Sequence, residues 1–125
     1  MSDVTATLYR PVGRYEFELI QASGFRTFPP RLTGQPFFYP VLSEEYAVQI
    51  ARDWNVKDEA SGCEGYVLKF NVRTAFLDQF DVRTVGSSTH REYWIPAEYL
   101  EQFNSNIVGA IEVVRHFLRL DQKLD

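Results

Sequence analysis

One stretch near residue 90 gathers more chemically capable side chains than any other part of the chain. It contains Ser87, Ser88, Thr89, His90, Arg91, Glu92 and Trp94, so hydroxyls, an imidazole, a guanidinium and a carboxylate follow one another. We expect a loop that leads into a strand, because binding residues often lie on loops held by a rigid scaffold. Glu92 and Trp94 would share one face of that strand, and the carboxylate could accept a hydrogen bond from a ribose hydroxyl. The alternative is an exposed strand face with a Glu–Arg ion pair, which stabilises little.

Two arginines are candidates for holding an anion. Arg10 ends an expected strand over residues 5–10, just before Pro11. Its guanidinium could bond two oxygens of a phosphate or ribose, or it could form an ion pair with a neighbouring carboxylate. Arg31 follows Phe28, Pro29 and Pro30 in a rigid aromatic and basic turn, which either walls a pocket or braces a long loop.

The spacing of apolar residues predicts the elements that must position these groups. Helices are expected over residues 14–22, where Tyr15 and Leu19 lie four apart, and from the N-cap Ser43 to about Asn55. The second helix would place Tyr46, Ile50 and Trp54 on one face. A helical turn over 74–80 and a short helix over 97–103 are also expected, with strands over 5–10, 37–42, 66–73, 81–85, 91–95 and 107–114.

This order of elements predicts one α+β domain over residues 1–125, with about six short strands and two or three helices. Residues 116–125 are polar, and we expect the tail from 118 onwards to be frayed helix. Pro40 interrupts the strand over 37–42 and places it at an edge. The aromatic residues Phe37, Phe38, Tyr39 and Tyr46 are more typical of a core than of a ligand platform.

Composition excludes several classes of function. The chain has 125 residues, a net charge of −4 and one cysteine, Cys63. The negative charge argues against nucleic-acid binding, which requires clustered Lys and Arg. A single cysteine and two distant histidines argue against a metal site. No apolar run reaches the ~18 residues of a membrane span, and residues 1–8 lack the features of a signal peptide, so we expect a cytoplasmic protein.

Four blocks of the chain resemble a family of small bacterial proteins that carry the label "ADP-ribosylation/crystallin". The blocks are Thr7–Gly13, Phe28–Arg31, Tyr46–Trp54 and Glu92–Glu98. The label itself points to ADP-ribosylglycohydrolases, which are large, all-helical enzymes with two metal ions held by acidic clusters. This chain is too short and too rich in strands for that architecture, so we do not expect that activity.

The order of elements instead resembles the ADP-ribosyltransferase fold. The resemblance implies that Arg10 on the first strand holds a phosphate or ribose of NAD. It implies that a middle tyrosine, either Tyr46 or Tyr39, stacks on the nicotinamide. It also implies that Glu92 bonds the nicotinamide ribose and stabilises an oxocarbenium-like transition state. His90 and Arg31 join Arg10 and Tyr39 as candidate NAD-binding residues, with Glu92 and Tyr46 as candidate catalytic residues and no metal.

The resemblance therefore implies a protein that binds NAD or ADP-ribose, with transfer of ADP-ribose as a candidate activity and a protein as one class of acceptor. A second reading is a non-enzymatic interaction or immunity-type module without nucleotide binding. It is motivated by the acidic charge and by the lack of any nucleotide-binding or hydrolase motif. A third is a small-ligand-binding domain with an aromatic pocket and no chemistry.

Overall fold

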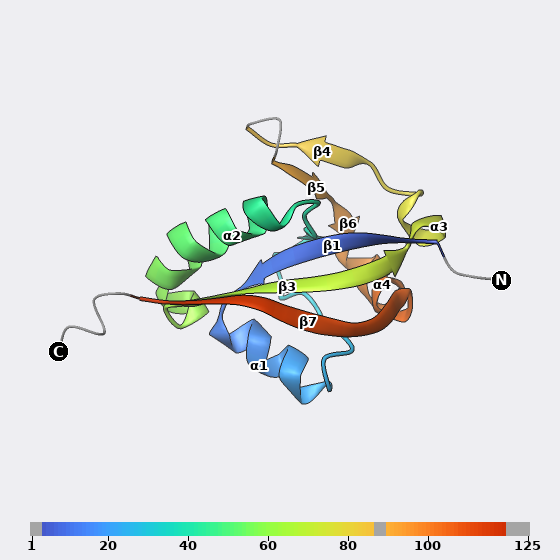
Figure 1. Ribbon diagram of the computed structural model, residues 1–125. Coiled ribbons are helices and arrows are strands. Elements are labelled where there is room, and N and C mark those ends of the chain that lie inside the picture. The colour runs from blue at the N-terminus through green and yellow to red at the C-terminus, as the bar shows by residue number, and fades with distance from the viewer. Residues whose placement is uncertain (1–3, 87–89, 120–125) are drawn as a thin grey trace.

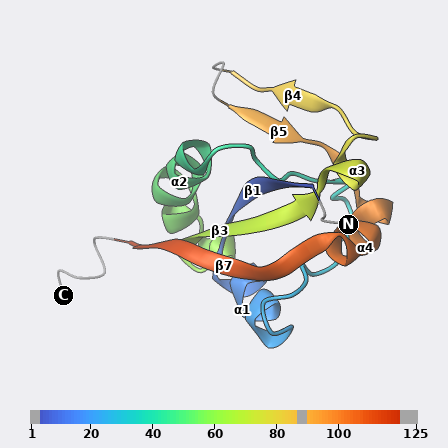
Figure 2. The same cartoon turned by 45° about the vertical axis from the view of Figure 1, so that its right-hand side comes forward.

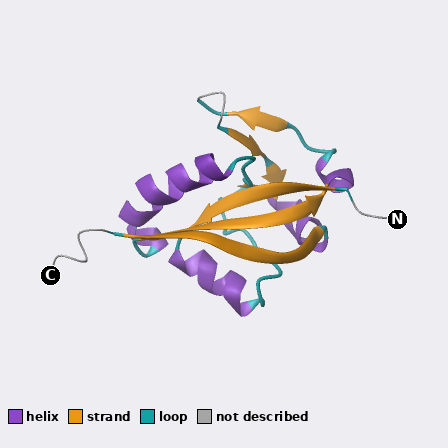
Figure 3. Ribbon diagram, viewed as in Figure 1, coloured by secondary structure: helices purple, strands orange, loops and turns teal. Residues whose placement is uncertain are grey.

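The structure is a computed structural model that describes residues 4–86 and 90–119 and has a mixed α+β fold (Figures 1 and 3). Its strands are β1 (Thr5–Val12), β2 (Phe37–Phe38), β3 (Glu64–Arg73), β4 (Val82–Thr84), β5 (Arg91–Tyr93), β6 (Ile95–Pro96) and β7 (Ile107–Leu118). Its α-helices are α1 (Arg14–Ala22), α2 (Glu44–Asp53), α3 (Thr74–Leu77) and α4 (Leu100–Ser105). The α+β class is confirmed, although the described residues form seven strands and four α-helices, more than the sequence predicted.

An antiparallel sheet in the order β1-β3-β7 forms the centre, with β3 between the other two strands. Beside it lie two small antiparallel pairs, β2-β6 and β4-β5. Val41 is the link between the two parts, because it forms a bridge with Tyr9 of β1 on one side and with Glu92 of β5 on the other. Figure 2 shows the β4–β5 hairpin standing away from the central sheet. The link at Val41 thus brings Glu92 towards β1.

Strand β1 continues through Pro11, where the sequence predicted its end. Tyr9 exchanges both backbone hydrogen bonds with Val41, at 2.9 and 2.8 Å, so its N–H and C=O point away from β3. Pro11, two residues on, points its nitrogen the same way and loses no bond to β3 by lacking an N–H. The same register would set Pro11 opposite Tyr39, where proline has no donor to offer. Pairing between β1 and the segment around Val41 stops there, and the two segments diverge.

Helices α1 and α2 cover opposite faces of the central sheet (Figures 1 and 2). Helix α1 has the bounds that the sequence predicted, and α2 begins after Ser43, whose side chain accepts a hydrogen bond from the Tyr46 N–H at 3.1 Å. Ala47 and Ala51 of α2 are fully buried. A Cβ added to Gly65 of β3 would lie 2.5 Å from the Ala51 carbonyl oxygen, so α2 rests directly on the β3 backbone.

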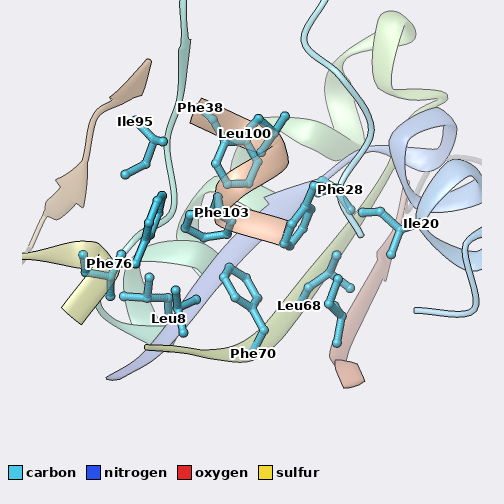
Figure 4. Packing of buried hydrophobic residues seen from close by; sticks show 14 residues of the cluster. Leu8, Ile20, Phe28, Phe38, Leu68, Phe70, Phe76, Ile95, Leu100 and Phe103 are labelled. Carbon is cyan, nitrogen blue, oxygen red and sulfur yellow. The ribbon is translucent and has the colours of Figure 1, made fainter. Parts of the chain in front are cut away.

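Aromatic rings fill the core on the α1 side of the sheet (Figure 4). Phe28 lies 5.0 Å from Phe38 and 4.9 Å from Phe70 between ring centroids, and Phe38 lies 5.1 Å from Phe103. All four side chains are at most 2% exposed. The loop that carries Phe28 is fastened to α4, because the Asn104 amide donates to the Phe28 carbonyl at 3.0 Å and accepts from its N–H at 2.9 Å.

Strand β7 runs further than predicted, to Leu118, where the sequence suggested a polar tail. Its end pairs with the start of β3: His116 lies opposite Tyr66 and Leu118 opposite Glu64. This long-range pairing overrides the polar local sequence, and residues 120–125 lie outside the described part. No helix among the described residues is long and apolar enough to cross a membrane.

Candidate functional site

Glu92 is the centre of the candidate site, on β5 beside the Val41 bridge. The Tyr46 hydroxyl donates to Glu92 Oε1 at 2.9 Å, and Trp94 Nε1 donates to Glu92 Oε2 at 2.9 Å. As predicted, Glu92 and Trp94 share one face of the chain. Glu92 makes no ion pair within the described residues. The two neutral donors fix the carboxylate and leave its charge and remaining lone pairs for a ligand.

Tyr46 of α2 holds Glu92, and His90 in turn packs against Tyr46. Partial burial, followed by the hydrogen bond to Glu92 and the charge of Glu92, raises the pKa of Tyr46 to about 12. The His90 ring stacks on the Tyr46 ring at 4.4 Å and 7°, and His90 Nε2 lies 3.0 Å from Gln49 Oε1. Tyr46 therefore remains a protonated donor to Glu92 throughout the physiological range. Ser87, Ser88 and Thr89 of the predicted polar stretch lie outside the described residues.

Arg10 lies on β1 and is 8% exposed. Its Nε and Nη2 atoms donate to the two carboxylate oxygens of Glu16 on α1, at 2.7 and 2.9 Å, and its guanidinium lies 4.5 Å from the Phe38 ring centroid. The ion pair with a neighbour that the sequence left open is thus present. The Nη1 atom makes no hydrogen bond with the described residues, so one edge of the guanidinium is available to a ligand.

A small cavity of about 230 Å³ opens where β1 and the segment around Val41 part. It is lined by Arg10, Pro11, Tyr39, Val41, Ile50 and Glu92, and we call it the Glu92 cavity. Of the two candidate middle tyrosines, Tyr39 lines this cavity, and its ring meets Trp94 edge-on at 5.6 Å. Tyr46 contacts Glu92 without being part of the lining. The fold thus gives the two tyrosines different positions, one facing the cavity and one holding the carboxylate.

A larger cavity of about 560 Å³ adjoins the first and shares Arg10 and Pro11 with it. Arg31 and Trp54 line it, and we call it the Trp54 cavity. Arg31 Nε donates to the Phe37 carbonyl at 2.9 Å. Desolvation and the neighbouring charge of Arg10 lower the pKa of the Arg31 guanidinium. Arg31 therefore walls a pocket, which was one of the two roles open from the sequence.

The apolar spacing within the helices wrongly predicted burial for several residues that line the Trp54 cavity. Tyr15, Leu19 and Trp54 fit a buried helical face in the sequence, but their exposed fractions are 55%, 58% and 59%. Ala47 and Ala51, which widen the same predicted face of α2, are its buried positions. A single helical stripe cannot distinguish a core face from the wall of an open cavity, because both are apolar.

Among residues 4–86 and 90–119, no group of three or more His, Cys, Asp or Glu side chains is placed to hold a metal ion. Comparisons of the chain with protein-family models, with curated proteins and with solved structures find no match.

Proposed function

We propose that this protein binds NAD with the nicotinamide riboside end in the Glu92 cavity and transfers the ADP-ribosyl group. The observation that carries the proposal is the convergence of Arg10, Tyr39 and Glu92 on one cavity. They are a guanidinium with one nitrogen left by its ion pair with Glu16, an aromatic ring, and a carboxylate that makes no ion pair with the described residues. These three kinds of group suit a cationic nicotinamide ring attached to a ribose and a phosphate.

Each residue has a task that follows from its contacts. Tyr39 offers its ring to the nicotinamide. Glu92 accepts a hydrogen bond from a ribose hydroxyl, and its negative charge stabilises the positive charge that develops on the sugar. Tyr46 and Trp94 hold the carboxylate in place, and Arg10 Nη1 donates to a ribose or phosphate oxygen.

NAD supplies an ADP-ribosyl group when the bond between the nicotinamide nitrogen and the ribose carbon breaks and nicotinamide leaves with the bonding electrons. A nucleophile on the acceptor, or water in its absence, then bonds to that carbon and gives up one proton. The negative charge of Glu92 favours the bond-breaking step more than the binding of NAD, because the positive charge spreads onto the sugar only as the bond breaks.

Nicotinamide release from NAD tests the proposal without knowledge of the acceptor. Glu92→Gln removes the charge but keeps the size of the side chain, and we expect the rate to fall by at least about a hundredfold. Glu64→Gln is the matched control, because Glu64 also accepts a hydrogen bond from a tyrosine hydroxyl, at 2.7 Å. We expect its rate within about twofold of wild type.

Two results would overturn the proposal. Equal rates for wild type and Glu92→Gln would remove the catalytic role of Glu92. Neither binding nor release at millimolar NAD would instead favour the interaction-module reading.

A further inference from the structure

The Trp54 cavity carries a feature that the reaction at Glu92 does not use. Eight large hydrophobic residues of the described chain are exposed, and four of them, Tyr15, Leu19, Leu32 and Trp54, line this one cavity. Exposed apolar side chains gathered in one concavity mark a binding site more often than scattered ones do. A volume of about 560 Å³ is in the range of small-molecule sites.

The two tryptophans show how open this cavity is. Trp94 is fully engaged, since its ring nitrogen bonds Glu92, its ring contacts Phe37 and Tyr39, and the Arg83 guanidinium lies 4.3 Å from its centroid. Trp54 is 59% exposed, and its ring makes no aromatic or cation–π contact within residues 4–86 and 90–119. Its face is therefore available to a flat ligand.

A cation lies in the same wall. Arg31 is half-buried and bonds the Phe37 carbonyl through Nε alone, so neither Nη1 nor Nη2 has a partner within the described chain. Glu16, whose charge acts on Arg31, already accepts from Nε and Nη2 of Arg10. Arg10, which is paired with Glu16, lies close enough for its charge to lower the pKa of Arg31. A half-buried guanidinium with two unused nitrogens is suited to a phosphate, which it can bond with two parallel N–H groups.

We propose that the Trp54 cavity binds a nucleoside 5′-monophosphate group, with the base against Trp54 and the phosphate on Arg31. The assignment of this group to the adenosine end of NAD rests on the proposed function. The shared wall of Arg10 and Pro11 supports it, because the two adjoining cavities then receive the two halves of one dinucleotide.

Trp54 itself provides the measurement. In a Trp94→Phe background, Trp54 is the sole tryptophan, and AMP should change its fluorescence saturably. Arg31→Gln should weaken AMP binding by about tenfold or more, because hydrogen bonds to a charged group are lost. Arg26→Gln, which removes an exposed arginine outside both cavities, is the matched control and should leave affinity within twofold. Cooperative thermal melts verify that each variant is folded.

The outcomes separate this inference from the proposed function. Saturable AMP binding that depends on Arg31 supports the inference even when wild type releases no nicotinamide, in which case only the proposed function fails. No fluorescence change at millimolar AMP, or equal weakening by Arg26→Gln, overturns it. So does AMP binding that Arg31→Gln leaves intact. If NAD is consumed while AMP neither binds nor competes, the proposed function stands and the Trp54 cavity has another occupant.

Discussion

Glu92 and Glu64 each bond a tyrosine that stacks on a histidine, but the two carboxylates differ in what else lies beside them. Each accepts a hydrogen bond from a tyrosine hydroxyl, Tyr46 at 2.9 Å and Tyr66 at 2.7 Å, and each tyrosine stacks on a histidine. His116 lies 3.1 Å from Glu64 and forms an ion pair with it when protonated. Glu92 makes no ion pair within the described chain and lines a cavity with Arg10. The residue types alone therefore do not distinguish a site from a structural cluster.

The difference comes from where each cluster lies in the sheet. Tyr66 is stacked between Phe17 of α1, at 3.9 Å, and His116 of β7, at 4.1 Å, so the Glu64 cluster joins three elements. The Glu92 cluster lies where Pro11 ends the pairing of β1 with the segment around Val41. A carboxylate beside such an opening can meet a ligand, whereas Glu64 already has His116 as a partner.

The largest expected effect is on the free energy of unfolding, and it compares the packing around Glu64 with the packing around Glu92. Gly65→Ala, next to Glu64, would place a Cβ 2.5 Å from the Ala51 backbone oxygen, and we expect it to lower the free energy of unfolding by about 3 kcal/mol. Gly86→Ala, on the hairpin that carries Glu92, has 3.7 Å of room but a φ of +79°, and we expect about 1 kcal/mol. Urea denaturation measures both. Equal losses in the free energy of unfolding would contradict the distinction between a tightly packed region around Glu64 and an open region around Glu92.

A smaller effect concerns the pH dependence of stability. Partial burial acts to raise the pKa of Glu64, but the hydrogen bonds from Tyr66 and His116 and the charges of His116 and Arg14 outweigh it and lower that pKa. A carboxyl with a lowered folded pKa contributes stability above its unfolded pKa of about 4.3, and loses it as pH falls through the folded value.

Glu64→Gln should therefore cost less than about 1 kcal/mol at pH 7 and flatten the fall in stability between about pH 5 and pH 3. Thermal melts across that range measure it. A slope equal to that of wild type would show that Glu64 contributes nothing through its charge.

The smallest effect concerns a property that the Glu92 and Glu64 clusters share, the raised pKa of their tyrosines. Burial first, and then the adjacent glutamate, raises the pKa of both Tyr46 and Tyr66 to about 12. Glu92→Gln should lower the pKa of Tyr46 alone and Glu64→Gln that of Tyr66 alone, each staying above 10 because burial remains. Absorbance titration of the phenolates measures the two tyrosine pKa values. A glutamate variant that left the pKa of its own tyrosine unchanged would show that the glutamate does not act on that tyrosine.

Local sequence predicted the elements better than it predicted the site. The Ser43 cap gave the start of α2, and alternation placed Glu92 beside Trp94, because these signals act over a few residues. The choice between Tyr39 and Tyr46 depended on how β1 parts from the neighbouring segment, which is a property of long-range register. The Glu64 cluster escaped notice because its histidine is 52 residues away.

Calorimetric titration with NAD tests the central claim, that ligand binding belongs to the Glu92 region and not to its counterpart. Arg10→Lys keeps the charge but removes Nη1, the guanidinium nitrogen that Glu16 does not engage, and Arg14→Lys makes the same change near Glu64. We expect wild type and Arg14→Lys to bind alike and Arg10→Lys to bind about tenfold more weakly. Equal affinity of all three, or no heat from wild type at millimolar NAD, would contradict the account.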